Sequence, residues 1–446
     1  MPPWVGAEEV TDPGRQGVEA AKKGDNELAI RYFSEAIRLN PNDAKAYRNR
    51  GLTYNAKKDY AKALADFNEA IRLNPKDASA FSGRGHAYES TDERDKAIAD
   101  YSEAIRLNPS EANAYYNRGL AYNKKGEYDK AIVDWNEVIR ANPKDAEAYY
   151  NRAFSYNKKE EYAKAIPDWN EAIRLYAKDE TAFHSRGIAF NHTKEYDKAI
   201  ADFSEAIKLK PTYAAAIYDR GLSYDMKGDY DKAITDFNEA IRLDPDFANA
   251  YYARGIVYHR KGESDKAVAD YSQAVRLNPK DADSYNNRGL AYEAKGDSEK
   301  AIADWNEAIR LNPNYANAYV NRGGVNESHG RHEKAIADFR EAIRVNPKDP
   351  DGYNRLAWIL GACAQANLRN PKEAVIDATK ACELTDWKEI HCLDTLAAAC
   401  AGAGDFKQAI KWQTKCVESS AADETFRAKA KIRLALYQAH RPYSEK

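Results

Sequence analysis

Long apolar runs and charge of one sign are both missing from this chain of 446 residues. No stretch approaches 18 consecutive apolar residues, so no segment is predicted to cross a membrane. Lys and Arg total 68 against 70 for Asp and Glu, and the two signs are interleaved along the chain. Nucleic acids and membrane surfaces attract concentrated basic faces, so we expect neither as a partner.

Cysteine is scarce and lies only in the last quarter of the chain, at Cys363, Cys382, Cys392, Cys400 and Cys416. An odd number in one segment is a poor disulfide framework, and predicts small apolar filling in a reducing compartment. The N-terminal sequence MPPWVGAEEVTDPG has no basic start and no apolar run, so it does not resemble a secretory signal. We therefore expect a cytoplasmic protein; a leader already removed from the chain is the alternative.

Motifs that carry chemistry are missing as well. The sequence has no Gly-rich phosphate loop, no nucleophile motif and no pair of metal ligands at helical spacing. His184 and His192 are eight residues apart, roughly 12 Å along a helix, which is too far to share a metal. We expect no catalytic residue, no metal and no cofactor, and therefore no enzyme.

The sequence does contain a strong internal repeat. Pro recurs at 41, 75, 109, 143, 211, 245, 279, 313 and 347, a step of 34 residues with one gap at Ala177. The copy from Ala44 to Asp77 defines positions 1 to 34 of the repeat. Position 4 is aromatic in almost every copy, position 8 is Gly, position 11 is mostly Tyr, positions 20 and 27 are Ala, and position 24 is Phe, Tyr or Trp.

This spacing predicts two helices in each repeat. Positions 4, 8 and 11 share one helical face, as do positions 20, 24 and 27. The aromatic residues are expected to fill the space left by Gly and Ala, which would let two backbones approach closely. A Lys-Gly-Asp-Tyr run turns the chain between the helices, and Asn-Pro ends the second helix. One repeat cannot bury its apolar face alone, so the repeats must stack.

The order of aromatic, Gly, Tyr, Ala, aromatic, Ala and Pro at 34-residue spacing resembles the tetratricopeptide repeat (TPR) family, over residues 10–423. The resemblance implies an all-α fold, an α-solenoid of stacked helix-turn-helix repeats in a right-handed superhelix. It also implies that the first helix of each repeat lines a concave groove that binds peptides or proteins.

We divide the chain by the regularity of these repeats. Residues 1–9 are a tail, and 10–349 hold ten repeats, the first half-degenerate because Pro13 takes its aromatic position. Residues 350–423 hold two divergent repeats, the first with about five extra residues in GACAQANLRN. Residues 424–446 are predicted to form a helix that caps the stack, with Phe426, Ala430, Leu434 and Tyr437 on one stripe, followed by a tail.

Two features depart from the family pattern. In nine repeats position 7 is Arg and position 23 is Asp, where apolar or bulky residues are usual. We predict that each Arg pairs with the Asp of its own repeat and links its two helices; exposure of both side chains to water is the alternative. Pro167 lies inside the second helix of 146–179, and Tyr176-Ala177 replaces Asn-Pro there, so this repeat is the predicted weak joint.

The predicted binding residues lie on the opposite face of the first helices. Position 5 carries an aromatic run, Tyr116, Tyr150, His184, Tyr218 and Tyr252, and position 6 carries Asn49, Asn117, Asn151, Asn287 and Asn321. Exposed aromatic side chains anchor partners, and a row of Asn side chains can pair with the backbone of an extended chain. The alternatives are ordinary surface variation for the tyrosines and solvation of the helices by the Asn side chains, among which position 12 adds Asn55, Asn123, Asn157 and Asn191.

We therefore expect a non-catalytic scaffold that binds an extended peptide or protein segment in the groove. Self-assembly is the first alternative, because an open solenoid can dock end to end. The second is a substrate-recruiting or regulatory subunit of a separate enzyme. The sequence names no partner.

Overall fold

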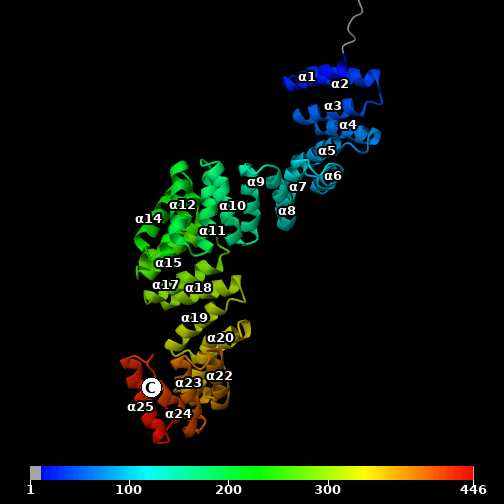
Figure 1. The fold of residues 1–446 in the computed structure, drawn as a ribbon. Coiled ribbons are helices and arrows are strands. Elements are labelled where there is room, and N and C mark those ends of the chain that lie inside the picture. The colour runs from blue at the N-terminus through cyan, green and yellow to red at the C-terminus, as the bar shows by residue number, and fades with distance from the viewer. Residues whose placement is uncertain (1–11, 445–446) are drawn as a thin grey trace, which may run out of the picture. The chain divides into compact units, whose positions relative to one another are not determined.

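The structure, a computed structural model, describes residues 12–444. It divides into two compact units at Lys227–Gly228, each built from successive antiparallel helix pairs (Figure 1). The predicted tail at 1–9 lies outside the described residues. No helix in the described part of the chain is both long and apolar enough to cross a membrane.

The first unit holds α1 to α13: Pro13–Lys22, Asn26–Leu39, Ala44–Ala56, Tyr60–Leu73, Ala78–Ser90, Arg94–Leu107, Ala112–Lys125, Tyr128–Ala141, Ala146–Lys158, Tyr162–Leu175, Glu180–His192, Tyr196–Leu209 and Ala214–Met226. The second holds α14 to α25: Tyr230–Leu243, Ala248–Arg260, Ser264–Leu277, Ala282–Ala294, Ser298–Leu311, Ala316–Ser328, His332–Val345, Pro350–Ala362, Pro371–Leu384, Ile390–Gly402, Phe406–Glu418 and Glu424–Gln438. A short 3-10 helix at Ala366–Leu368 lies in the predicted insertion.

The turns between helices follow the predicted signals. Position 15 of the repeat is left-handed, with φ near 77° at Gly126 and 61° at Lys58, the conformation that Gly adopts without strain. At the end of a repeat, Asn74 is the extended C-cap of α4, and its side chain accepts a hydrogen bond from the Lys76 amide at 3.2 Å. Asp77 then caps α5 by accepting from the Ala80 amide at 3.2 Å.

The core of each repeat is formed by the aromatic residue at position 24 and its small neighbours. Phe67, between Ala63 and Ala70 on α4, is fully buried. Gly at position 8 lies closest to this ring, and the predicted approach of two backbones is seen at Gly85, where a Cβ atom would lie 3.2 Å from the Ala97 carbonyl oxygen. A Cβ atom on Gly187 would lie 2.6 Å from the ring of Phe203, and one on Gly119 would lie 2.9 Å from Trp135.

The aromatic residues at positions 4 and 11 pack against the core, as predicted: Tyr115 and Tyr122 lie against the cluster around Trp135. Most of them are half-buried, and they also flank the Arg at position 7. The Arg118 guanidinium lies 5.7 Å from the ring centre of Tyr115 and 5.8 Å from that of Tyr122. These two rings therefore hold a cation in addition to packing against the core.

The predicted Arg–Asp pairs are confirmed in eight repeats. Arg118 donates from Nε and Nη2 to the two oxygens of Asp134 at 2.9 and 2.7 Å, and Asp134 is fully buried. The other seven pairs join Arg50 to Asp66, Arg84 to Asp100, Arg152 to Asp168, Arg186 to Asp202, Arg254 to Asp270, Arg288 to Asp304 and Arg322 to Asp338. Arg220 and Asp236 are divided between the two compact units.

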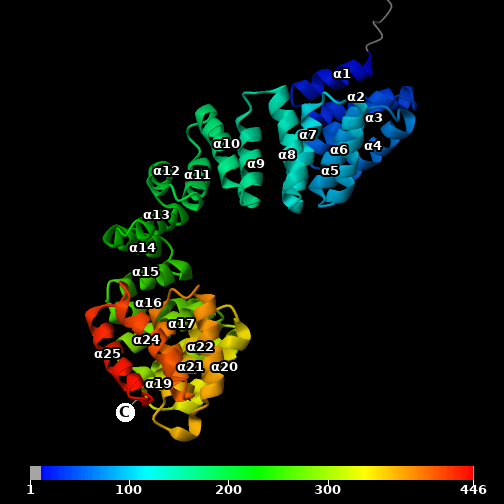
Figure 2. The same ribbon diagram turned by 60° about the horizontal axis from the view of Figure 1, so that its bottom comes forward.

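The C-terminal repeats bury the most apolar side chains. Their core includes Leu356, Ile359, Leu396 and Tyr437 together with all five Cys residues, which are free and buried. Burial raises the pKa of the Cys400 thiol to about 11. These thiols pack as the apolar filling that the sequence predicts. Figure 2 shows α24 and α25 side by side at the end of the chain.

Candidate functional site

Four of the five aromatic residues at position 5 lie on successive first helices of the first unit, and Tyr252 lies on α15 of the second. Tyr116 is on α7, Tyr150 on α9 and His184 on α11. Each ring packs against the buried aromatic residue of its own repeat: the centroids of Tyr116 and Trp135 are 5.3 Å apart, and those of Tyr150 and Trp169 are 4.9 Å apart, both edge to face. The two tyrosines are half-buried rather than fully exposed as expected, and only part of each ring remains available to a partner.

The tyrosine hydroxyls reach the next repeat. Tyr116 donates to the Glu147 carboxylate at 2.6 Å, and the Tyr150 and Thr181 hydroxyls are 3.3 Å apart. Burial and the hydrogen bond to Glu147 raise the pKa of Tyr116 above its ordinary value. Both tyrosines therefore contact the neighbouring repeat as well as the hollow described below.

His184 lies between Tyr213, the N-cap of α13, and Asp219 on α13. Its Nε2 is 2.7 Å from the Asp219 carboxylate, and its Nδ1 is 3.0 Å from the Tyr213 hydroxyl. A carboxylate only accepts, so in the neutral ring Nε2 donates and Nδ1 accepts from Tyr213. His184 thus links α11 to α13, which also carries the half-buried Tyr218.

A hollow of about 740 Å³ opens beside two of these tyrosines. Tyr116, Glu147, Tyr150 and Asn151 line it from the first helices, and Ala172, Leu175 and Tyr176 line it from the end of α10. Tyr176 stands where other repeats have Asn before Pro, and 58% of its surface is exposed. The same change that marks 146–179 as irregular therefore adds a third tyrosine to the hollow.

The predicted residues of the second unit form a chain of hydrogen bonds. The Asn287 amide donates to the Tyr252 hydroxyl at 2.8 Å. Asn286 donates to Asn287 at 3.1 Å and accepts from Asn321 at 3.0 Å. This chain joins α15, α17 and α19, so these amide groups already have partners within the protein.

The other Asn residues of position 6 do not share one role. Asn49 accepts from the neighbouring Arg48 side chain at 3.2 Å. Asn151 donates to the Glu147 carbonyl at 2.8 Å, within its own helix, and Asn117 is half-buried on α7. The structure brings only Asn151 to the hollow with Tyr116 and Tyr150.

The Asn residues at position 12 link adjacent repeats. Asn55 donates to the Gly83 carbonyl at 2.8 Å, and Asn157 donates to that of Ser185 at 3.2 Å. Asn123 instead accepts from the Ser155 hydroxyl at 2.7 Å. The other amide atom of each residue, Oδ1 of Asn55 and Asn157 and Nδ2 of Asn123, is buried and makes no hydrogen bond in the described part of the chain.

A second pocket in the C-terminal repeats escaped prediction, although its residues follow the rule used for the groove. Asn354 is at position 5 and Trp358 at position 9 of the repeat that begins at Pro350. Extending the position 5 column to this repeat would have found Asn354. In the described part of the chain, no group of three or more His, Cys, Asp or Glu side chains could hold a metal ion.

Comparison with known families gives matches over most of the repeats. A family model described as TPR repeat matches residues 192–228, 226–262 and 258–296. Two models described as tetratricopeptide repeat match residues 15–78, 83–146 and 286–353, and residues 135–166.

Solved structures of repeat proteins are similar in part. YrrB, described as a TPR protein with an unusual peptide-binding site, is 28% identical, with 42% of this chain and 97% of YrrB covered and a TM-score of 0.40. MamA is 27% identical, with 36% and 95% covered and a TM-score of 0.35. Yeast Tom70 is 18% identical over 96% of this chain and 95% of its own, with a TM-score of 0.42.

Proposed function

Because the chain belongs to the tetratricopeptide repeat family, whose arrays are protein-interaction scaffolds, we propose that it holds an extended segment of a partner protein against the first helices of its repeats. The proposed contact surface is the hollow beside Tyr116 and Tyr150, here called the tyrosine hollow. The observation that carries the proposal is that three predicted groove residues, Tyr116, Tyr150 and Asn151, line one concavity.

The chemistry of the tyrosine hollow suits a polypeptide. Three tyrosines offer ring surface, and the exposed Tyr176 ring is free to move against a ligand. Glu147 and Asp179 provide acceptors, which suit backbone amides or a basic side chain. An aromatic side chain that a partner covers contributes on the order of 2 kcal/mol to the free energy of binding, so two or three of them supply much of the binding free energy.

The first experiment is capture of partners on the intact chain, with identification by mass spectrometry. The affinity of the captured protein is then measured for Tyr116→Ser/Tyr150→Ser, which removes both rings. We expect binding to weaken at least 100-fold, at roughly 1.4 kcal/mol per tenfold. Tyr116→Phe/Tyr150→Phe keeps the rings and removes only the bonds to Glu147 and Thr181, so it should bind nearly as well as the native chain.

The matched control is Tyr128→Ser/Tyr196→Ser, which changes two half-buried tyrosines at the first residues of α8 and α12, outside the tyrosine hollow. Helicity and the melting temperature are recorded for every variant, because Tyr116 and Tyr150 also contact the next repeat. Unchanged affinity in a folded Ser variant contradicts the proposal. Sedimentation over a range of concentrations tests the alternative of self-assembly, and capture of an enzyme would favour the regulatory subunit.

A further inference from the structure

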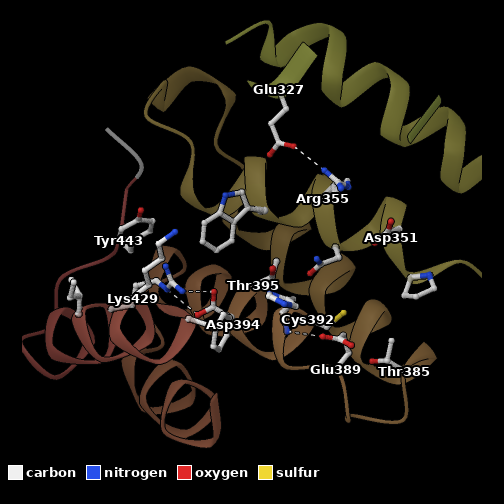
Figure 3. A pocket seen from close by; sticks show the side chains of 17 residues that line it. Glu327, Asp351, Arg355, Thr385, Glu389, Cys392, Asp394, Thr395, Lys429 and Tyr443 are labelled. Carbon is white, nitrogen blue, oxygen red and sulfur yellow. Dashed lines mark hydrogen bonds and ion pairs between the residues drawn. The ribbon is translucent and has the colours of Figure 1, made fainter. Parts of the chain in front are cut away.

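The C-terminal repeats enclose a pocket of about 850 Å³, here called the C-terminal pocket. Its sides come from the first helices α21 and α23, from α25 and from the chain end near Tyr443, with Glu327 of α19 at its edge (Figure 3). All of these residues belong to the second compact unit. A volume of this size is within the range of ligand-binding pockets.

A buried ion pair replaces the regular Arg–Asp pair beside this pocket. The two divergent repeats carry Leu356 and Leu396 at position 7, where the regular repeats carry Arg. Arg433 of α25 instead donates to both oxygens of Asp394 on α23, at 2.9 and 2.7 Å. The Arg433 guanidinium also lies 5.7 Å from the Trp358 ring and 5.5 Å from the Tyr443 ring, so it fixes two aromatic sides of the pocket.

The insertion in the repeat that begins at Pro350 positions the chain end. Arg369 donates from Nε to the Cys363 carbonyl at 2.6 Å and from Nη2 to the Ser444 hydroxyl at 2.8 Å. The Tyr443 ring is thereby held 6.0 Å from the Trp358 ring. The extra residues of this repeat therefore contribute to a side of the pocket through the tail that they hold.

Two buried polar atoms on α21 have no partner. Oδ1 of Asn354 is an acceptor and Nε of Arg355 is a donor, and neither makes a hydrogen bond in the described part of the chain. Unsatisfied buried polar atoms cost free energy, and a peptide unit offers one N–H and one C=O. Asn354 and Arg355 are adjacent on α21 and both line the pocket. Neither atom has appreciable exposed surface, so a bound peptide satisfies them only after the two side chains rotate toward the pocket.

Within residues 12–444, three charged groups that line the pocket make no ion pair: Lys429, Asp351 and Glu389. Figure 3 shows Lys429 beside Tyr443 on one side and Asp351 on the other. Two other cations are already neutralised, Arg433 by Asp394 and Arg355 by Glu327 at 3.6 Å. The pocket therefore has no excess of positive charge for a phosphate group, but it has a cationic side and an anionic side.

We propose that the C-terminal pocket is a second docking site, separate from the tyrosine hollow, for an extended peptide segment with a large apolar or aromatic side chain. That side chain packs on Trp358 and on Ile432, which is 63% exposed. An acidic residue of the peptide lies toward Lys429 and a basic residue toward Asp351. The inference rests on the proposed function in one respect, that the ligand is a polypeptide.

The test is selection of a displayed library of random nine-residue peptides on the intact chain, followed by affinity measurement on the variants. We expect the selected peptides to share an aromatic residue with an acidic residue on one side and a basic residue on the other. Trp358→Ala should weaken them at least tenfold. Lys429→Glu changes an exposed side chain, and selection on that variant should replace the acidic residue by Lys or Arg.

Each outcome decides a part of the proposal. Failure to select any peptide overturns it, as does a set of peptides whose affinity is unaffected by both Trp358→Ala and Lys429→Glu. If peptides selected on Lys429→Glu still carry the acidic residue, the placement of that residue toward Lys429 is overturned. If the selected peptides lose binding only on Tyr116→Ser/Tyr150→Ser, they bind in the tyrosine hollow and the C-terminal pocket is overturned as their docking site. If they lose binding only on Trp358→Ala, they bind in the C-terminal pocket and not in the tyrosine hollow.

Discussion

At the scale of single residues, the Arg at position 7 makes hydrogen bonds in addition to those with the Asp of its own repeat. Besides Asp134, Arg118 donates from Nη1 to the Ser102 hydroxyl at 2.9 Å, on the second helix of the preceding repeat. Arg152 makes the same contact to Asn136 at 2.7 Å. One guanidinium therefore joins three helices with its planar set of donors, a geometry that Lys cannot reproduce.

Replacing Arg118 by Leu should leave Asp134 buried without a partner. We expect the free energy of unfolding of the surrounding repeats to fall by about 3–5 kcal/mol. Arg118→Leu/Asp134→Tyr restores an apolar pair and should be neutral or stabilising, so the two changes should not be additive. Chemical denaturation of the single and double variants measures this coupling, and strict additivity would show that the pair contributes nothing. Ser102→Ala is the control for the bond to the preceding repeat.

The decrease in the free energy of unfolding caused by Arg118→Leu should also depend on pH. Burial raises the pKa of Asp134 above its ordinary value of 3.8 even though Arg118 lowers it, and removal of Arg118 raises it further. A carboxyl group with a raised folded-state pKa stabilises the fold when protonated, and this contribution is lost as the pH rises through that pKa. The variant should therefore be closest to the native chain at about pH 4 and furthest from it near neutral pH.

At the scale of helices, α10 shows how a repeat tolerates two departures from the pattern. The helix runs from Tyr162 to Leu175 through Pro167, whose side chain is exposed to solvent. Arg152 still pairs with Asp168 on this helix. Tyr176 takes the extended C-cap conformation that Asn adopts elsewhere, and Asp179 caps α11 at the Thr181 and Ala182 amides. Tertiary packing therefore keeps the helix in place where its own sequence opposes it.

We expect this repeat to be the first interior repeat of the first unit to open. Pro167 has no amide hydrogen to donate to the Ala163 carbonyl, and its ring crowds that carbonyl. Hydrogen exchange followed by mass spectrometry should show less protection in residues 160–185 than in α8 or α12, because repeats are stabilised by their neighbours and open locally. Pro167→Ala should raise protection in this window. Equal protection in the three segments would contradict the prediction.

At the scale of the whole molecule, the end of the chain matters because a stack of repeats has an open face. Tyr437 and Ala430 of α25 are fully buried in the C-terminal core, and Arg433 neutralises Asp394. A chain that ends at residue 423 would expose this core and leave Asp394 without its cation. The role of α25 as a cap is a prediction that this truncation tests.

We expect the truncated chain to lose about 3–5 kcal/mol in the C-terminal repeats, at roughly 1.5–3 kcal/mol for each large apolar side chain that α25 no longer covers, and to self-associate through the exposed face. Thermal denaturation and sedimentation measure the two effects. A chain that ends at residue 440 keeps α25 and loses only the tail, so it should melt close to the native chain. Equal melting temperatures for the two truncations would show that α25 does not stabilise the stack.

The sequence by itself determined the features that repeat within 34 residues. Helix pairs, their turns and the Arg–Asp pairs follow from spacing, because Arg118 and Asp134 are only 16 residues apart on two helices joined by a tight turn. The identity of the core residue at position 24 followed for the same reason. Each of these contacts is local, and nine copies report the same pattern.

Only the tertiary structure decided which groove residues are available. Whether Asn55 faces a ligand or the Gly83 carbonyl depends on how the next repeat packs, which spacing within one repeat does not specify. The C-terminal pocket depends on contacts such as Arg369 with Ser444 and Trp358 with Tyr443, which join segments 75 and 85 residues apart. Each of these contacts occurs once, so it leaves no repeating pattern in the sequence. The contacts form only when the divergent helices and the chain end have folded against one another.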